Sequence, residues 1–204
     1  MLELIAMITM LIDHIGAVFV PHMAVLRIIG RISFPIYCFL LVRGSSKTGN
    51  FYRYLFRLTL LALISQPIYF DLFGWKRPNV IFTLSVCLII LKLMEKPKVP
   101  HIILSLILTL ILASGFEYSA YAVLLVLIYR YIKNPYNILV AHSVVNISYF
   151  FRYGWIQQFS ILGSLIIALY LWGLLPKYDI NRSVYRAFYP LHMLCLLIIK
   201  IYLN

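Results

Sequence analysis

Charged residues are scarce in this chain, and acidic residues are the scarcest. Only 12% of the 204 residues are charged, and six Asp and Glu stand against 18 Lys and Arg. A soluble domain carries about 25% charged residues, so this composition argues against one. Apolar residues make up 63% of the chain and form long runs, without the alternation typical of a membrane barrel. The sequence therefore predicts an all-α, polytopic transmembrane helical bundle.

Cysteine is also rare, and no compact basic patch is present. Cys38, Cys87 and Cys195 lie in apolar runs at spacings that match neither a metal site nor a disulfide framework. We therefore expect small core residues and no metal. The net charge of +12 comes from basic residues scattered between the apolar runs, which is typical of connections between membrane segments. We expect contact with membrane lipid and no binding of nucleic acid.

The apolar runs predict about nine membrane segments. Several are short for a hydrocarbon core that needs about 20 residues per helix, so one or two are expected to be tilted or half-spanning. No linker divides the chain, and residues 1–204 are predicted to form a single membrane-embedded domain. The segments cover residues 2–20, 24–42, 53–72, 79–94, 100–115, 118–133, 136–151, 155–175 and 184–203.

Basic residues are concentrated in every second connection between these segments. The odd-numbered connections contain only Lys76, Arg77 and Arg152. By the positive-inside rule, the even-numbered connections face the cytoplasm, and the N-terminus with them. We therefore expect a multi-pass protein of the cell (plasma or inner) membrane. The basic residues of the even-numbered connections are Arg43, Lys47, Arg53, Arg57, Lys92, Lys96, Lys98, Arg130, Lys133, Lys177, Arg182 and Arg186.

Two ionisable side chains, Asp13 and His14, interrupt the first apolar segment. An ionisable group at mid-bilayer costs at least about 2.5–3.5 kcal/mol, and such groups usually have a function. Adjacent residues on a helix do not face each other, so each must meet a different partner. His14 exchanges protons near neutral pH, and we predict a catalytic site containing His14 and Asp13. An equally strong alternative for Asp13 is a purely structural pairing with Arg27 or Arg31.

Arg27 and Arg31 are four residues apart and therefore share one face of the second segment. A pair of guanidinium groups in a cavity forms a fork-shaped anion site, so we expect these residues to bind substrate or an oxyanion. The alternative is that both side chains extend to the lipid headgroups.

Later segments add further polar candidates. Glu117 and Tyr118 open the sixth segment, where the alternative is an interfacial anchor. His192 lies a few residues inside the ninth segment, where a structural role is the alternative. His142, in a polar stripe with Ser143 and Asn146, is expected to line the same cavity.

Six stretches follow one another in a recognisable order: LIDHIGAVF, LRIIGRISFPIYCFLLVRG, ISQPIYFDLF, NVIFTL, EYSAYAVLL and FYPLH. Together they resemble the pattern of the TraX family of integral-membrane acetyltransferases, over residues 5 to about 195. That family is named after the conjugation protein that acetylates the N-terminus of F pilin. It belongs with multi-span acyltransferases that use cytoplasmic acetyl-CoA to modify extracytoplasmic acceptors.

The resemblance implies that His14 is the catalytic base. Asp13, Arg27 and Arg31 fall on the accompanying polar positions of the family, and Glu117, Tyr118 and His192 match later motif positions. The implied reaction moves an acetyl group from acetyl-CoA to an extracytoplasmic peptide or protein amine. We expect the phosphates of acetyl-CoA to bind Arg43, Lys47, Arg53 and Arg57.

Other functions remain open at this point. One is O-acylation of a cell-surface glycan by the same residues. Another is a small proton-coupled transporter in which Asp13, His14 and Glu117 form a relay. A third is a structural subunit for pilus assembly, although that role leaves the intramembrane charges without a purpose.

Overall fold

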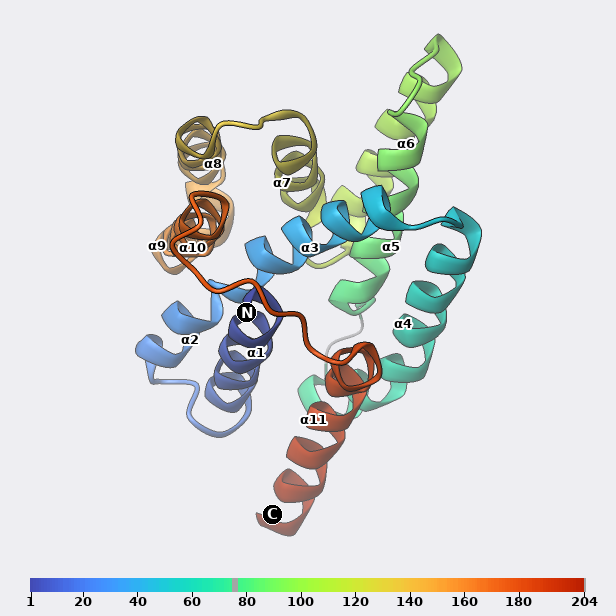
Figure 1. Cartoon of the computed structure of the whole chain (residues 1–204). Helices are drawn as coiled ribbons and strands as arrows, with labels where there is room; N and C mark the ends of the chain where they lie inside the picture. Colours follow the sequence, from blue (N-terminus) through green and yellow to red (C-terminus); the bar gives the residue numbers. More distant parts are fainter. Residues whose placement is uncertain (75–76, 204) are drawn as a thin grey trace.

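The computed structural model describes residues 1–74 and 77–203, and the regular elements in this part of the chain are all α-helices. The predicted all-α fold is confirmed. In Figure 1, α3 (Ser33–Lys47) crosses the middle of the molecule, while α6 (Val99–Gly115) and the C-terminal end of α11 (Arg182–Leu203) project from it. The remaining helices are α1 Leu2–Phe19, α2 Ala24–Gly30, α4 Phe51–Phe73, α5 Val80–Leu93, α7 Ser119–Tyr131, α8 Pro135–Ser148, α9 Phe150–Gln158 and α10 Ile161–Leu171.

Each predicted segment corresponds to helix, but two segments are broken. The second divides between Gly30 and Ser33 into α2 and α3, which together are long and apolar enough for one span. The eighth contains the end of α9 and all of α10, and these two helices meet at a 57° bend. Within the described residues, four helices are long enough to cross a membrane, or five with the bent pair. Helices α5, α6 and α7 are shorter and apolar, as the short predicted segments require.

Local chemistry accounts for the bounds of α4. The Asn50 side chain accepts a hydrogen bond from the Arg53 backbone N–H and so caps the first turn. Gly74 ends the helix in the left-handed region, at φ 66°. The helix continues through Pro67 between these two residues. The Gln66 side chain donates to the Arg77 carbonyl, which fastens the chain after α4 back onto the helix. Lys76, one of the three basic residues of the odd-numbered connections, lies outside the described residues.

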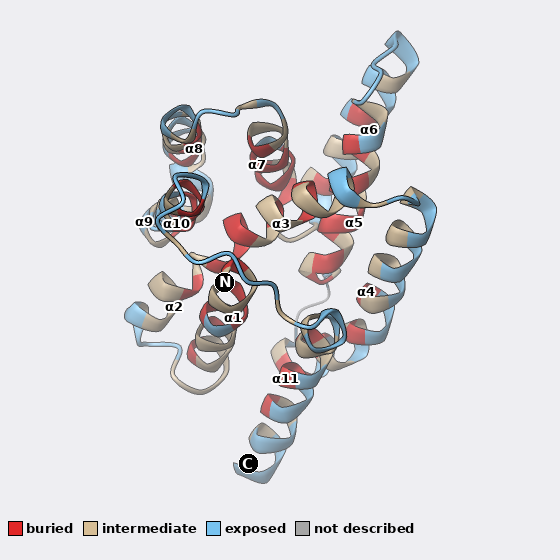
Figure 2. Ribbon diagram, in the orientation of Figure 1, coloured by how far each residue is buried: buried red, intermediate tan, exposed pale blue. Residues whose placement is uncertain are grey.

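Buried side chains form two apolar clusters. The larger one joins α3, α5, α7 and α10, and the smaller one joins α1, α4 and α11. Figure 2 shows the buried positions on the inward faces of these helices, whereas much of α6 is exposed. Cys38 and Cys87 are buried, as expected of core residues, but Cys195 is exposed. Exposed apolar helix surface of this kind suits contact with lipid tails.

At Gly163, α10 approaches α3 too closely to leave room for a side chain. A Cβ at this position would lie 2.6 Å from the Ile32 carbonyl oxygen and 3.1 Å from the Pro35 Cβ. Because backbone cannot yield as a side chain can, Gly163→Ala is expected to destabilise the protein by about 1–3 kcal/mol. Gly115→Ala is the control, since a Cβ there meets nothing within 4 Å. Thermal unfolding in detergent tests this, and equal midpoints for the two variants would contradict the packing.

Candidate functional site

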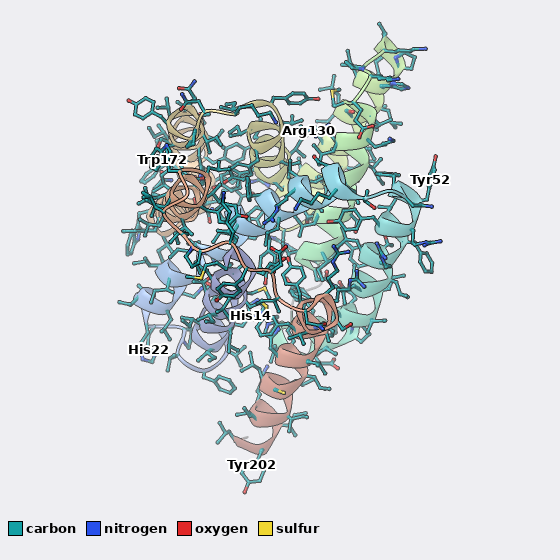
Figure 3. The ribbon with its side chains drawn as sticks, in the orientation of Figure 1. His14, His22, Tyr52, Arg130, Trp172 and Tyr202 are labelled. Carbon is teal, nitrogen blue, oxygen red and sulfur yellow. The ribbon has the colours of Figure 1, made fainter. Side chains whose placement is uncertain are left out.

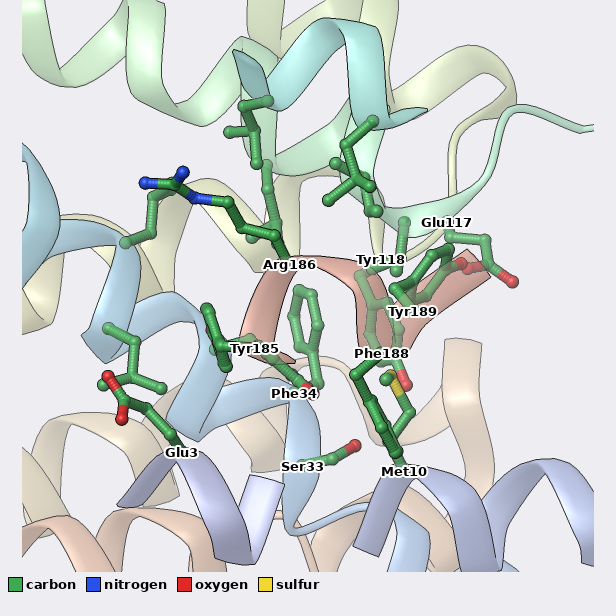
Figure 4. Close-up of a pocket in the computed structure, with 18 of the residues that line it drawn as sticks. Glu3, Met10, Ser33, Phe34, Glu117, Tyr118, Tyr185, Arg186, Phe188 and Tyr189 are labelled. Carbon is green, nitrogen blue, oxygen red and sulfur yellow. The ribbon is translucent and has the colours of Figure 1, made fainter. Parts of the chain in front are cut away.

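A cavity of about 1120 Å³ extends between α1, α3, α4, α5 and α11. Its lining includes Glu3, at the start of α1, and Arg186, in the first turns of α11. The lining continues past His14 to Glu117, which lies in the turn between α6 and α7. Figure 4 shows Glu3, Tyr185 and Arg186 on one side of the cavity and Glu117 on the other. The cavity therefore reaches from the starts of α1 and α11 to the turn before α7.

One end of this cavity, called here the basic mouth, is strongly cationic. Arg43 is the member with an acidic neighbour, Asp179, at 3.5 Å. Glu3 also lies there and accepts a hydrogen bond from the Ile180 backbone N–H. Most of the positive charge is therefore left unbalanced, which suits an anionic ligand. The basic mouth consists of Arg43, Lys47, Arg57, Arg182 and Arg186.

The basic mouth overlaps only in part with the residues expected to bind acetyl-CoA. Arg43, Lys47 and Arg57 line the cavity, whereas Arg53 is exposed outside it. Sequence reasoning assigned Arg182 and Arg186 only to topology, yet both line the cavity. Their position just ahead of FYPLH, one of the stretches that carry the resemblance, is the signal that was available in the sequence.

Asp13, Arg27 and Arg31 form a partly buried ion cluster, called here the Asp13 triad. Arg27 Nη1 lies 2.9 Å from Asp13 Oδ2, and Arg31 Nη2 lies 3.1 Å from Asp13 Oδ1. The Arg27 side chain also donates to the Asp13 backbone carbonyl at 3.0 Å. The side chains are 13% to 24% exposed, and all three residues line the cavity. Two guanidinium groups and one carboxylate leave a net positive charge facing the cavity.

Gly30 explains how α2 approaches α1 closely enough to form this triad. A Cβ at position 30 would lie 2.0 Å from Asp13 Oδ1, so any side chain there would displace the carboxylate. Arg31 follows directly and extends the cluster, because Nη1 donates to the Tyr118 hydroxyl at 3.2 Å and to Gln157 Oε1 at 3.3 Å. The triad thereby links α1 and α2 to α9 and to the turn before α7.

His14 and His192 come together from opposite ends of the chain. His14 Nδ1 lies 2.8 Å from His192 Nε2, and the rings stack with centroids 5.0 Å apart. His192 Nδ1 lies 2.7 Å from the Phe188 carbonyl oxygen, which can only accept, so Nδ1 of His192 carries a proton. In neutral His192 the other nitrogen then accepts from His14 Nδ1–H. This assignment leaves His14 Nε2 with a free lone pair.

His14 is the member of the histidine pair that reaches the cavity. It belongs to the cavity lining, whereas His192 lies behind it. Phe73 packs edge-on against the His14 ring at 5.0 Å, and Tyr189 lies 6.4 Å away. Figure 3 shows His14 near the centre of the molecule and His22 at its edge. The His14 imidazole therefore lies in the cavity wall beside two aromatic rings.

Glu117 lies at the far end of the cavity, in a turn with unusual backbone geometry. Its carboxylate accepts a 2.6 Å hydrogen bond from the Tyr69 hydroxyl, and its backbone carbonyl accepts from Thr83. Tyr118 and Ser119 both have positive φ, 57° and 51°. Two such residues cost about 1–3 kcal/mol each and often mark functional sites. Burial raises the pKa of the Glu117 carboxyl above its usual value.

The same turn directs Tyr118 onto the Asp13 triad. Its ring stacks on Phe34 with centroids 3.7 Å apart, and its hydroxyl accepts from Arg31. Sequence reasoning missed Tyr69 and Tyr189, although both lie within stretches that carry the resemblance.

His142 and Asn146 do not line this cavity, contrary to expectation. Both are buried in a separate network between α7, α8 and α10. The Tyr121 hydroxyl lies 2.8 Å from His142 Nε2 and donates to Asn146 Oδ1, and His142 Nδ1 lies 2.6 Å from the Ser164 hydroxyl. Because these polar groups form hydrogen bonds with one another, a structural role suits them.

Comparison with known proteins covers almost the whole chain. The family profile described as TraX protein matches residues 1–200. A probable fimbrial assembly protein FimC, serogroup H1, of Dichelobacter nodosus is 27% identical, and the alignment covers 100% of this chain and 96% of that protein. An uncharacterized protein of Rickettsia prowazekii (strain Madrid E) is 49% identical over 39 residues, 19% of this chain and 16% of its own. No solved structure matches the chain. The match over residues 1–200 shows that this membrane protein belongs to the TraX family.

Proposed function

We propose that this protein is a membrane acetyltransferase that moves an acetyl group from cytoplasmic acetyl-CoA to an extracytoplasmic acceptor in pilin-related assembly. The observation that carries the proposal is the His14–His192 pair, which leaves His14 Nε2 a free lone pair in a residue that lines the same cavity as the Asp13 triad. Membership of the TraX family and the likeness to a fimbrial assembly protein support an acceptor of the pilin class.

The basic mouth is the proposed binding site for the phosphates of acetyl-CoA. Five cationic side chains converge there from α3, α4 and α11, and guanidinium groups bind phosphate through two parallel hydrogen bonds. This end belongs to the even-numbered connections, which favour the cytoplasmic side by the positive-inside rule. The cavity between the basic mouth and His14 would hold the pantetheine arm, so that the thioester reaches the base.

In this mechanism His14 acts as a general base. Nε2 takes a proton from the acceptor while the acceptor attacks the thioester carbonyl carbon. The resulting imidazolium is stabilised through His14 Nδ1–H, which donates to His192 Nε2, and through His192 Nδ1–H, which donates to the Phe188 carbonyl. When the carbon–sulfur bond breaks, His14 returns the proton to the thiolate of CoA. A covalent variant, in which Nε2 first accepts the acetyl group, uses the same atom.

The Asp13 triad supplies the positive charge that the reaction needs. Attack on the thioester places a negative charge on its carbonyl oxygen, and fixed cations stabilise such an oxyanion. Asp13 holds both guanidinium groups in place and cancels only one of their two charges. Asp13 would therefore act through the two arginines and not as a proton relay, since its carboxylate accepts hydrogen bonds from Arg31 and pairs with Arg27.

Substitution of His14 tests the assignment of the base. General base catalysis contributes typically about 10²–10⁴-fold, so His14→Ala should reduce acetyl transfer by at least about 100-fold. Transfer of a labelled acetyl group from acetyl-CoA to a peptide with a free N-terminus is the measurement. The thermal stabilisation by acetyl-CoA serves as the folding control and should remain. Full transfer by His14→Ala would exclude both the base and the covalent variant.

Arg57 and Arg53 form a matched pair for testing the donor site. They lie about one turn apart on α4, but only Arg57 lines the cavity. A ligand at 100 times its dissociation constant adds about 2.7 kcal/mol of stability, so acetyl-CoA should raise the wild-type unfolding midpoint. Arg57→Ala is expected to lose most of this increase, because a charged hydrogen bond contributes about 1.5–3 kcal/mol. Arg53→Ala should keep it. No increase in the wild-type protein, or equal losses in both variants, would contradict the assignment.

A further inference from the structure

The connection between α10 and α11, residues 172–181 and called here the strap, runs along the basic mouth. Figure 1 shows the strap passing beside the N-terminus on its way to α11. Asp179 and Ile180 of the strap belong to the cavity lining. The strap therefore forms part of the wall of the basic mouth and brings an acidic side chain to this cationic site.

The strap is fastened on both sides of Asp179. The Ile180 backbone N–H donates to the Glu3 carboxylate at 2.7 Å, and the amino group of Met1 donates to the Tyr178 carbonyl. Because its two neighbours are held against the start of α1, Asp179 stays beside the basic mouth. A charged group tethered in this way acts at a high effective concentration.

The ion pair of Asp179 with Arg43 is loose compared with the Asp13 triad. Its two charged groups lie 3.5 Å apart, and the Asp179 side chain is 65% exposed. Asp13 is only 13% exposed and accepts hydrogen bonds from Arg31 at 3.1 Å and 3.3 Å. Exposed ion pairs contribute little to stability. The contact of Asp179 with Arg43 can therefore be exchanged for a stronger one without disrupting the fold.

Arg43 has a second contact that does not depend on Asp179. Its guanidinium group lies 5.5 Å from the centroid of the Tyr170 ring, and Tyr170 is buried. A cation over an aromatic face is attracted to it, so this contact helps to orient the guanidinium group. A phosphate can bind such a group through two parallel hydrogen bonds. Asp179 and a phosphate would therefore compete for the same side chain.

We propose that Asp179 competes with the phosphates of the donor for Arg43, and so sets the affinity of the basic mouth for its anionic ligand. The inference rests on the proposed donor site and adds an affinity-determining residue to it. When a phosphate binds Arg43, the Asp179 carboxylate turns into the solvent, to which it is already largely exposed. Removing the charge of Asp179 should then strengthen donor binding, whereas loss of a ligand-binding residue would weaken it.

A neutral isostere tests the competition in thermal-unfolding titrations of the detergent-purified protein. Asp179→Asn should lower the acetyl-CoA concentration for half-maximal stabilisation by about 3-fold to 10-fold, because a competing contact and a repulsive charge are both removed. The difference should shrink as salt rises, since the Debye length falls from about 30 Å at 0.01 M to about 8 Å at 0.15 M. Glu95→Gln is the control, because Glu95 pairs with Lys92 at 2.7 Å in an exposed ion pair outside this cavity. This variant should titrate like the wild-type protein.

A double-mutant cycle shows whether the effect acts through Arg43. In the Arg43→Ala background, Asp179→Asn should lose most of its gain, because the side chain for which Asp179 competes is gone. An equal gain with and without Arg43 would overturn the competition and indicate a general effect of charge. An unchanged or weaker affinity in Asp179→Asn alone would also overturn it.

Pyrophosphate separates this inference from the proposed function, because it carries phosphates but no acetyl group. If acetyl-CoA stabilises the wild-type protein and Asp179→Asn at equal concentrations, Asp179 is no competitor and the donor site stands. If pyrophosphate binds more tightly to Asp179→Asn while acetyl-CoA stabilises neither protein, the competition stands and the proposed function fails. If Asp179→Asn does not fold, Asp179→Ser removes the same charge and carries the same test.

Discussion

The ion cluster formed by Asp13, Arg27 and Arg31 is the interaction on which the rest of the site depends. Removing one member of a buried ion pair leaves an uncompensated charge and costs about 3–5 kcal/mol. The fold accommodates the cluster through Gly30, where any side chain would collide with the Asp13 carboxylate. Arg31 then reaches Tyr118 and Gln157. One carboxylate thus fixes the approach of α2 to α1 and the position of the turn that carries Glu117.

The cluster explains why the second apolar segment is broken. In a continuous helix over residues 27 to 43, the helical pitch alone would fix the position of Arg31 relative to Asp13. The break between α2 and α3 allows α2 to follow α1, while α3 crosses the molecule and buries Phe34 and Cys38. Interruption of a membrane helix is tolerated where protein groups or a cavity satisfy the freed backbone. Here the Ser33 hydroxyl bonds the Gly30 carbonyl, and the Arg31 side chain bonds the Arg27 carbonyl.

Hydrophobicity alone predicted the helical class and the approximate helices, because long apolar runs leave few other structures in a membrane. The two breaks were not predicted, since they depend on contacts between helices and not on local composition. In the site, the spacing of Arg27 and Arg31 indicated one shared face, and a pairing with Asp13 was one of two readings. The contact of His14 with His192 was beyond prediction from the residues, because 178 positions separate them. His142 was misplaced for a related reason: a polar stripe on a helix does not reveal which neighbour it faces.

His14, the base of the proposed mechanism, depends on a contact between opposite ends of the chain. His14 Nε2 is unprotonated only because His192 accepts from Nδ1, and His192 accepts only because the Phe188 carbonyl fixes its own proton. The free lone pair on His14 Nε2 therefore requires α11 to pack on α1. At the basic mouth, Glu3 binds the backbone of Ile180, and the amino group of Met1 contacts the Tyr178 carbonyl. These contacts hold the chain before α11 against the start of α1, at the end of the molecule that is proposed to bind the donor.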